Sequence, residues 1–229
     1  MKITLFTGNN IRHNYLINLL STVSDEVYVV QECSTLFTGK VPDYYPASKL
    51  MEEYFEKVKN AQLKLFGNNY VNKLSKNIKT LPVVYGDLNK FSLSELNDFL
   101  KSDIYIVFGS SYIKSELIYF LIEKKTINIH MGVSPYYRGT DCNFWALYDD
   151  NPHLVGATIH MLSKGLDSGP MLYHAVSNIK TNPFEYTMST VKSAFHSIAQ
   201  RINDRSIFNL KPELQLKEKE IRYSKKTDF

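Results

Sequence analysis

Short apolar runs alternate with helically spaced segments at the start of the chain. Residues 2–7 (KITLFT) and 25–32 (DEVYVVQE) have the apolar, β-branched character of buried strands. Between them, NNIRHNYLINLLS repeats apolar residues at nearly helical spacing and offers an Asn as a helix cap. A strand, a helix and a second strand in this order are typical of the start of an open α/β sheet.

A longer helical pattern fills residues 47–77. Lys and Glu occupy one face, and the apolar positions on the other face are Leu50, Tyr54, Val58, Ala61 and Leu65. We predict an amphipathic, half-solvated helix or helix pair at the periphery of the fold. The pattern is equally compatible with an insertion that shapes a pocket and with a surface for a partner.

The rest of the chain continues the alternation of strands and helices. SLSELNDFL has a capping-box pattern typical of a helix start, because Glu95 follows Ser92 by three residues. Residues 164–170 (KGLDSGP) form a predicted tight loop, and the charged end of the chain allows one short strand. Further predicted strands lie at 81–87, 103–109, 126–130, 155–163 and 171–179, and further predicted helices at 114–125, 142–150 and 184–202.

This order indicates one α/β domain over residues 1–205, with the helical insertion at about 47–77 and a short charged C-terminal tail over 206–229. The predicted fold class is an open, mostly parallel, Rossmann-like sheet, and the right-handed crossover rule places helices on both of its faces. Ligands of such sheets lie beyond the carboxyl ends of the strands. The end of TINIH, residues 126–130, therefore falls where we expect the functional site.

Composition narrows the possible classes of protein. The 229 residues are 44% hydrophobic and 22% charged, which is an ordinary globular composition. The net charge of +4 and the pI near 8.8 suit an anionic small molecule at least as well as nucleic acid. Because Cys33 and Cys142 are far apart, we predict neither a disulfide framework nor a metal site, and the expected compartment is a reducing cytoplasm.

No segment has the pattern of a targeting or membrane sequence. The N-terminal MKITLFTGNN lacks the long apolar core of a signal peptide. The most apolar stretch, residues 102–122, is interrupted by Gly, Ser, Lys and Glu. We therefore predict a core strand and a helix there, and no membrane span.

Asn128 and His130 stand two residues apart in the predicted strand TINIH. Because side chains alternate along a strand, these two point to one face, while Ile127 and Ile129 point to the other. An amide beside an imidazole can bind one developing negative oxygen, or the imidazole can serve as a base near neutral pH. By spacing alone, two polar groups that cap a strand end are the simpler explanation.

Asp167 lies in the loop KGLDSGP, between two glycines and a proline. Such a loop holds a carboxylate where the backbone bends tightly. The carboxylate can orient His130 or take up a proton from an attacking amine. An aspartate that only stabilises its own turn is the more common case.

Together these pieces form a longer series. NIHMGVSPYYRG is followed by a segment with Trp145 and then by GATIHMLSKGLDSGPM. The series resembles the formyltransferase family that uses N10-formyltetrahydrofolate, whose usual text is close to NIHPSLLPKYRG and GVTIHLMDEGIDTGPI. The resemblance is clear over about residues 103–176 and weaker over the first strand and helix. The chain departs from the family text at Met131 and Gly132, where relatives often carry Pro-Ser.

The resemblance implies the formyltransferase fold, an acyl-transfer reaction and the catalytic triplet Asn128, His130 and Asp167. Asn128 and a protonated His130 would stabilise the oxyanion, with Asp167 keeping His130 charged; His130 as the base is the competing assignment. The cofactor-binding residues implied for N10-formyltetrahydrofolate are Ser111, Tyr112, Ile113, Leu162 and Gly165. The candidate substrate-binding residues are Arg12, His13, Tyr137 and Arg138.

The resemblance also narrows the acceptor. The chain lacks the Gly-x-Gly-Ser-Asn phosphate loop of the purine-pathway relative, and the residues after its last long helix are too few for the tRNA domain of methionyl-tRNA formyltransferase. We therefore expect formyl transfer to the amine of a nucleotide-linked amino sugar, with neither nucleic acid nor membrane as a partner. Formylation of another amine, such as that of methionyl-tRNA, and a non-catalytic folate- or nucleotide-binding module are the alternatives. Similar proteins are often homodimers, but the sequence does not give the oligomeric state.

Overall fold

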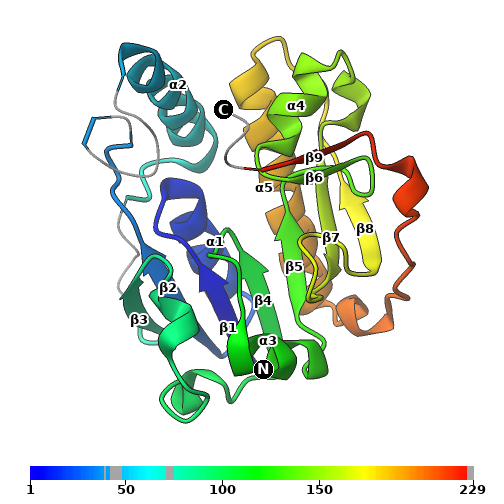
Figure 1. Cartoon of the computed structure of the whole chain (residues 1–229). Helices are drawn as coiled ribbons and strands as arrows, with labels where there is room; N and C mark the ends of the chain where they lie inside the picture. Colours follow the sequence, from blue (N-terminus) through cyan, green and yellow to red (C-terminus); the bar gives the residue numbers. More distant parts are fainter. Residues whose placement is uncertain (39, 42–47, 71–74, 226–229) are drawn as a thin grey trace.

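A seven-stranded sheet forms the centre of the computed structural model, which describes residues 1–38, 40–41, 48–70 and 75–225 (Figure 1). The strands, in their order across the sheet, are β3 (Ile78–Val84), β2 (Glu26–Cys33), β1 (Lys2–Thr7), β4 (Ile104–Phe108), β5 (Ile127–His130), β7 (Ala157–Met161) and β8 (Met171–Ala175). The first five are mutually parallel, and β7 is antiparallel to both of its neighbours. The predicted open, mostly parallel sheet is confirmed.

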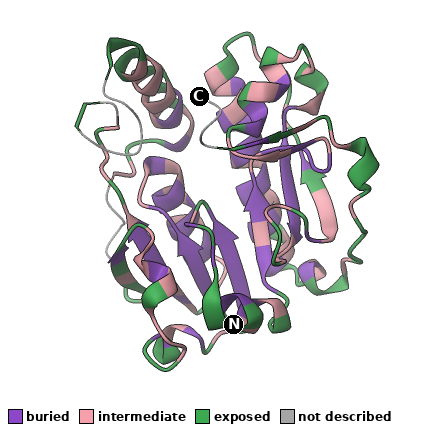
Figure 2. Cartoon of the chain, in the orientation of Figure 1, coloured by how far each residue is buried: buried purple, intermediate pink, exposed green. Residues whose placement is uncertain are grey.

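The sheet is covered on both faces because its central strands are apolar on both sides. On β4, Ile104, Ile106 and Phe108 belong to one core cluster, while Tyr105 and Val107 belong to a second cluster on the opposite face. These strands form a continuous buried layer through the middle of the molecule (Figure 2).

Helices α1 (Ile11–Ser21) and α5 (Pro183–Asn203) contribute to the first cluster, and α2 (Lys49–Phe66) packs against both of them. Helix α3 (Ser115–Glu123) covers the second cluster on the other face. Helix α4 (Cys142–Tyr148) packs against α5 and the short strand β6 (Tyr137–Gly139). The prediction of helices on both faces is therefore confirmed.

One helix prediction is narrowed by the structure, and another needs correction. The pattern over 47–77 gives a single helix that ends at Phe66, because Gly67 follows it with a φ of 72°; residue 47 and residues 71–74 lie outside the described part. SLSELNDFL has the predicted capping contacts between Ser92 and Glu95, yet it forms turns and one 3₁₀ turn. A segment this short gains too few hydrogen bonds to offset helix nucleation. The 3₁₀ turns are Asp87–Lys90, Asn97–Phe99, Pro152–Leu154, Ser206–Asn209 and Lys217–Lys219.

The charged C-terminal segment returns to the domain. Its predicted short strand exists as β9 (Arg222–Ser224) and pairs in parallel with β6, as Figure 1 shows. A side chain at Gly139 would collide with the Ser224 carbonyl, so this pairing depends on glycine. Residues 226–229 lie outside the described part. Within the described ranges, no helix is long and apolar enough to cross a membrane.

Candidate active site

Strand β5 delivers Asn128 and His130 to the same side, as the sequence predicted. Ile127 and Ile129 point the other way into the core cluster under α5. Because β5 pairs with β7 in antiparallel register, Asn128 lies directly opposite His160. A second imidazole is thereby fixed beside the amide.

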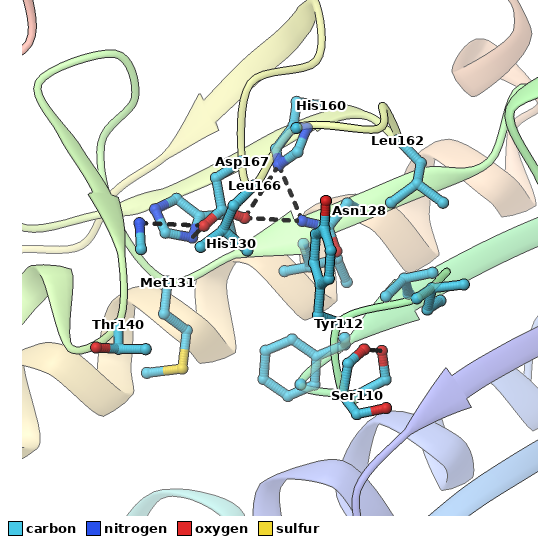
Figure 3. Close-up of a pocket in the computed structure, with 18 of the residues that line it drawn as sticks. Ser110, Tyr112, Asn128, His130, Met131, Thr140, His160, Leu162, Leu166 and Asp167 are labelled. Carbon is cyan, nitrogen blue, oxygen red and sulfur yellow. Dashed lines mark hydrogen bonds and ion pairs between the residues drawn. The ribbon is translucent and has the colours of Figure 1, made fainter. Parts of the chain in front are cut away.

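Asp167 closes the site from the loop after β7. Its Oδ2 lies 3.3 Å from His130 Nδ1 and accepts a hydrogen bond from the Gly139 amide at 3.2 Å. Its Oδ1 lies 3.4 Å from Asn128 Nδ2. Figure 3 shows these contacts converging on the carboxylate. The three residues of the predicted catalytic triplet are thus neighbours in space.

The backbone around Asp167 is held in an unusual shape. Asp167 itself has a left-handed φ of 47°. Gly169 passes so close to the Met161 carbonyl that a Cβ would lie 1.7 Å from its oxygen. The Gln215 side chain, from the C-terminal segment, donates to the carbonyls of Asp167 and Gly169 at 2.8 and 2.7 Å. The predicted tight loop is confirmed, and the C-terminal segment supports it.

Burial and charge act against each other in this cluster. Burial lowers the pKa of His130, and the neighbouring Asp167 carboxylate only partly offsets this. Burial acts to raise the pKa of Asp167, but the imidazoles of His130 and His160 and the Gly139 amide together bring it below its usual value. A neutral imidazole beside an ionised carboxylate is the resulting state near neutral pH.

His130 faces an acceptor at each ring nitrogen. Nδ1 faces Asp167, and Nε2 lies 3.2 Å from the Tyr137 carbonyl oxygen. A neutral ring has one N–H and can donate to only one of these two acceptors, whereas a protonated ring donates to both. The site therefore balances burial, which favours the neutral ring, against two acceptors that favour the charged one.

His160 is a site residue that the sequence reasoning missed. Its side chain is almost fully buried, with Nε2 2.9 Å from Asn128 Nδ2 and Nδ1 2.9 Å from the Met161 carbonyl oxygen. The available signal was the polar residue inside the otherwise apolar strand GATIHML. Buried polar side chains need hydrogen-bond partners, so this position already indicated a polar neighbour.

A cavity of about 710 Å³ opens in front of the triplet, and Asn128, His130 and Asp167 are among its lining residues. All five predicted cofactor-binding residues line it: Ser111, Tyr112, Ile113, Leu162 and Gly165. The Tyr112 hydroxyl donates to the Lys164 carbonyl across the cavity. A volume of this size is typical of small-molecule sites.

Glu32 holds the loop that carries Ser111. This carboxylate is almost fully buried and accepts hydrogen bonds from the Ser111 amide at 2.5 Å, the Ser111 hydroxyl at 2.8 Å and the Gly86 amide at 2.8 Å. Since both donors of Ser111 are already used, its contribution to the cavity wall is mainly shape. Glu32 carried no signal in the sequence, because its partners come from distant segments.

The predicted substrate-binding residues divide into two pairs. Arg12 and His13 line the cavity, and the buried His13 ring accepts a hydrogen bond from the Asn10 amide at Nδ1. Tyr137 and Arg138 are not among the lining residues of the cavities found in the described part of the chain. The prediction that their side chains face the ligand does not fit this structure.

The reason lies in β6, which carries both residues. The Tyr137 ring is buried and its hydroxyl donates to Asp149 at 3.3 Å, while its carbonyl faces His130. The Arg138 guanidinium forms an ion pair with Glu220. Tyr137 therefore supports His130 through its backbone, and Arg138 anchors the C-terminal segment.

A second cavity, of about 740 Å³, adjoins the first, and the two share lining residues that include Arg12, Met131 and Asp141. Aromatic side chains from three helices line it: Tyr54 and Phe55 from α2, Phe144 and Tyr148 from α4, and Phe184 at the start of α5. Helix α2, which by sequence was equally compatible with a pocket-shaping insertion and a partner surface, is thus one wall of a cavity.

Met131 and Gly132, where the sequence departs from the usual family motif, lie where the two cavities meet. Met131 lines both cavities directly after His130. A Cβ at Gly132 would lie 2.5 Å from both the Cys142 Cβ and His130 Nε2. Glycine therefore lets the His130 ring and the start of α4 pack closely together.

The site has no visible metal centre. In the described residues, no group of three or more His, Cys, Asp and Glu side chains is placed to hold a metal ion. The polar groups of the site are an amide, two imidazoles and a carboxylate, which together suit hydrogen bonding and proton transfer.

Comparison with known proteins gives a family. The model of the formyl transferase family matches residues 92–205, the segment that holds β4, β5, β7 and the Asp167 loop. A methionyl-tRNA formyltransferase from Thermosynechococcus vestitus is 35% identical over 80 residues, which is 35% of this chain and 24% of that protein. The match thus spans about a quarter of that relative's length.

Solved structures match over the whole chain. A 4-N formyltransferase from Francisella tularensis has a TM-score of 0.60 and 18% identity, covering 100% of this chain and 77% of that one. A formyltransferase from Anoxybacillus kamchatkensis, solved with a UDP-linked formamido sugar and tetrahydrofolate, has a TM-score of 0.53 and 19% identity, covering 100% and 87%. These likenesses show that the fold is shared.

Proposed function

Because residues 92–205 of this chain belong to the formyl transferase family, we propose that the protein transfers a formyl group from N10-formyltetrahydrofolate to an amine of a nucleotide-linked amino sugar. One observation carries the proposal: Asn128, His130 and Asp167 cluster on the wall of the first cavity. Met131, the residue after His130, lines both cavities. Two ligands seated in the two cavities would meet at this cluster.

The triplet supplies the functions that acyl transfer to an amine requires. Asn128 donates a hydrogen bond to the formyl oxygen as negative charge develops there. The His130–Asp167 pair accepts the proton that the amine loses as its nitrogen bonds to the formyl carbon. The same pair returns a proton to the folate nitrogen as the bond from that nitrogen to the formyl carbon breaks. Each proton and electron pair is thereby accounted for.

The lowered pKa of His130 bears on the choice between its two roles. A ring that is neutral near neutral pH can accept a proton, and Asp167 then stabilises the charge that forms. This supports the base over a permanently charged oxyanion donor. Asn128 is left as the side chain placed to donate to the formyl oxygen before any proton has moved.

The first cavity suits the folate ring system. Much of its wall comes from two segments, the end of β4 with the loop after it (residues 107–114) and the loop over residues 162–167, joined by the Tyr112 contact to the Lys164 carbonyl. Backbone groups of these loops and the side chains of Ile113 and Leu162 give the mixed polar and apolar lining that a bicyclic heterocycle needs. The bound formyl-folate would supply the activated formyl group.

The second cavity suits an acceptor with an aromatic ring and a charged linker. Aromatic walls from α2, α4 and α5 can stack on a base, and the Arg12 guanidinium lies where the cavities meet. One similar structure, a formyltransferase from Helicobacter canadensis, was solved with folinic acid and dTDP-3-aminofucose. A ligand of this kind has the base, the diphosphate and the amine that our proposal assigns to the acceptor.

A methionyl-tRNA amine is the second candidate. It is favoured by the curated relatives, since those from Thermosynechococcus vestitus and Caldanaerobacter subterraneus are named methionyl-tRNA formyltransferases. A tRNA acceptor would require a basic face, and its binding would weaken steeply with added salt.

A panel assay tests the proposal. The protein is incubated with N10-formyltetrahydrofolate and, separately, with UDP- and dTDP-linked amino sugars, free amino sugars and methionyl-tRNA, and the products are weighed by mass spectrometry. We expect a gain of one formyl group on a nucleotide-linked amino sugar. Formylation of methionyl-tRNA alone would select the second candidate, and formylation of no amine would refute both. Light scattering on the same samples checks the homodimer, which stays a prediction.

A further inference from the structure

A chain of hydrogen bonds runs from the backbone carbonyl of Met161 through the His160 ring to the Asn128 amide. His160 Nδ1 lies 2.9 Å from the Met161 oxygen, and Nε2 lies 2.9 Å from Asn128 Nδ2. A carbonyl oxygen only accepts, so Nδ1 donates its hydrogen to Met161, and in a ring with a single hydrogen Nε2 then presents its lone pair to Asn128. The group of Asn128 that faces His160 must therefore be its NH2. A dashed line in Figure 3 marks this contact.

Asp167 imposes the same polarity on Asn128. Its Oδ1, which can only accept when the carboxylate is ionised, lies 3.4 Å from Asn128 Nδ2. An amide turned the other way would place its carbonyl oxygen against a lone pair and a carboxylate at once. The contact with His160 is the shorter of the two, so His160 contributes most to the orientation.

Both acceptors lie toward one edge of the amide nitrogen. The distances of 2.9 Å from Nδ2 to His160 Nε2, 3.4 Å from Nδ2 to Asp167 Oδ1, and 3.8 Å between Nε2 and Oδ1 form a triangle with an acute angle at Nδ2. The two N–H bonds of a planar amide diverge by about 120°. An N–H that points at His160 therefore leaves the second N–H directed past Asp167 Oδ1. That contact is long, at 3.4 Å, and bent, so this hydrogen can also donate to a ligand.

We propose that His160 is a positioning residue, which fixes the polarity of the Asn128 amide so that its second N–H faces the first cavity. The inference rests on the proposed function for its kinetic consequence, because that N–H would donate to the formyl oxygen. Without His160, the amide can turn and present its own oxygen to the developing negative charge. The hydrogen-bond donor would then be replaced by the amide oxygen, whose partial negative charge repels the developing oxyanion.

Packing alone is the competing explanation for a buried histidine at this position. His160 is 1% exposed and adjoins Gly169, so that any smaller residue would also disturb the Asp167 loop. Two variants separate the explanations. His160→Gln keeps an oxygen that can accept from Asn128, whereas His160→Leu fills space and offers no acceptor. His153→Leu, at an exposed position on a 3₁₀ turn, is the control.

The kinetic test is a double-mutant cycle with Asn128→Ala. We expect His160→Leu to lower kcat by about 10- to 100-fold, part of the 10²- to 10³-fold effect of removing an oxyanion donor, with KM values nearly unchanged. His160→Gln should recover most of that loss, and His153→Leu should match the wild type. In the Asn128→Ala background, His160→Leu should cost almost nothing further. Additive losses, or a loss equal in the Gln and Leu variants, would overturn the proposal.

A second readout does not depend on activity. Nitrogen chemical shifts in a long-range ¹⁵N–¹H correlation spectrum report the tautomer of each histidine, and we expect His160 to carry its hydrogen on Nδ1. The Asn128 side-chain NH2 signals should shift in His160→Leu far more than in His160→Gln. An Nε2–H tautomer would overturn the inference even if formyl transfer is observed. The expected tautomer in a protein that formylates nothing would refute only the proposed function.

Discussion

The two cavities share the residue Met131 but have differently built walls. The first is organised around Asn128, His130 and Asp167, which come from one strand and one loop and are linked by hydrogen bonds to each other and to His160. The second is lined by aromatic side chains of three helices, in ring contacts such as that of Tyr54 with Phe184, at 5.5 Å between centroids.

The two walls differ in how exact their geometry has to be. Hydrogen bonds depend steeply on distance and angle, so the first wall presents fixed groups at fixed positions. Ring contacts tolerate a range of offsets and angles, so the second wall can accept related ligands. We expect substitutions of the hydrogen-bonded triplet to change kcat, and substitutions of the aromatic side chains in the second wall to change KM for the acceptor. The predictions below test that separation, from the largest expected effect to the smallest.

The largest effect is expected from the His130–Asp167 pair. Asp167→Asn and His130→Asn should each lower kcat by about 10²- to 10⁴-fold, because each removes a group that moves or holds the proton. KM for both ligands should change little. Steady-state kinetics measure both constants, and Asp98→Asn, at a side chain that is 86% exposed, is the matched control. Near wild-type turnover in either variant would show that the mechanism is wrong.

The aromatic wall should give the opposite pattern. Tyr54→Ala and Phe184→Ala each remove one ring from the wall of the second cavity. A ring that stacks on the acceptor's base is worth about 0.5–1.5 kcal/mol beyond buried area, so KM for the acceptor should rise about 3- to 10-fold. The kcat value and KM for formyl-folate should stay within twofold or so of the wild type. Phe208→Ala, at an exposed ring away from both cavities, is the control. A fall in kcat without a change in KM would contradict the prediction that the aromatic wall acts on acceptor binding alone.

Glu32 tests whether the folate loop needs its buried carboxylate. In Glu32→Gln one acceptor oxygen becomes an NH2 that faces the donors of Ser111 or Gly86, which should cost about 1–3 kcal/mol of unfolding free energy. KM for formyl-folate should rise severalfold while KM for the acceptor stays unchanged. Urea unfolding and steady-state kinetics measure the two effects. Glu123→Gln, at the exposed end of α3, should change neither.

The smallest effect concerns pH. Burial lowers the pKa of His13 and of His130 below the usual 6.5, so the unfolded chain binds protons that the folded chain does not. Unfolding free energy should therefore be highest above pH 6.5 and fall as the pH drops below it, by up to about 1.4 kcal/mol per pH unit for each such histidine. Urea unfolding at pH 7.5, 6.5 and 5.5 measures the slope.

His13→Gln should make this slope shallower, whereas His153→Gln, at an exposed site, should leave it unchanged. A slope that is identical in all three proteins would mean that the buried ring of His13 does not titrate as its environment indicates. That outcome would also weaken the assignment of a neutral His130.

Much of the fold was predictable because its signals are local. The period of two in TINIH and the apolar run of β4 are set by the strands themselves. The alternation of strands and helices indicates an open α/β sheet but does not give the order of its strands. Alternation likewise put Asn128 and His130 on one face, whereas the association of Asp167 with them was implied only by the family resemblance. The failure at SLSELNDFL is also local in origin, because its cap is present but its length is insufficient.

Other parts of the site depend on contacts between distant segments. Glu32 meets Ser111 across 79 positions of sequence, and Gln215 reaches the Asp167 carbonyl across 48. Arg138 looked like a ligand-binding cation, but its nearest partner is Glu220, from a segment that the sequence predicted as a tail. A pattern along the chain does not identify the hydrogen-bond or ion-pair partner of a charged side chain when that partner comes from a distant segment.

The α/β class, the strand that ends in Asn128 and His130, and the loop that carries Asp167 could all be inferred from patterns along the chain. These features arise from hydrophobic periodicity and turn chemistry, which act over a few residues. Two features came only from the folded arrangement: β7 runs antiparallel beside β5, so that His160 faces Asn128, and α2, α4 and α5 line a second cavity. Pairing and packing join residues that are far apart in the chain, and the free energy of those contacts exists only once the chain has folded.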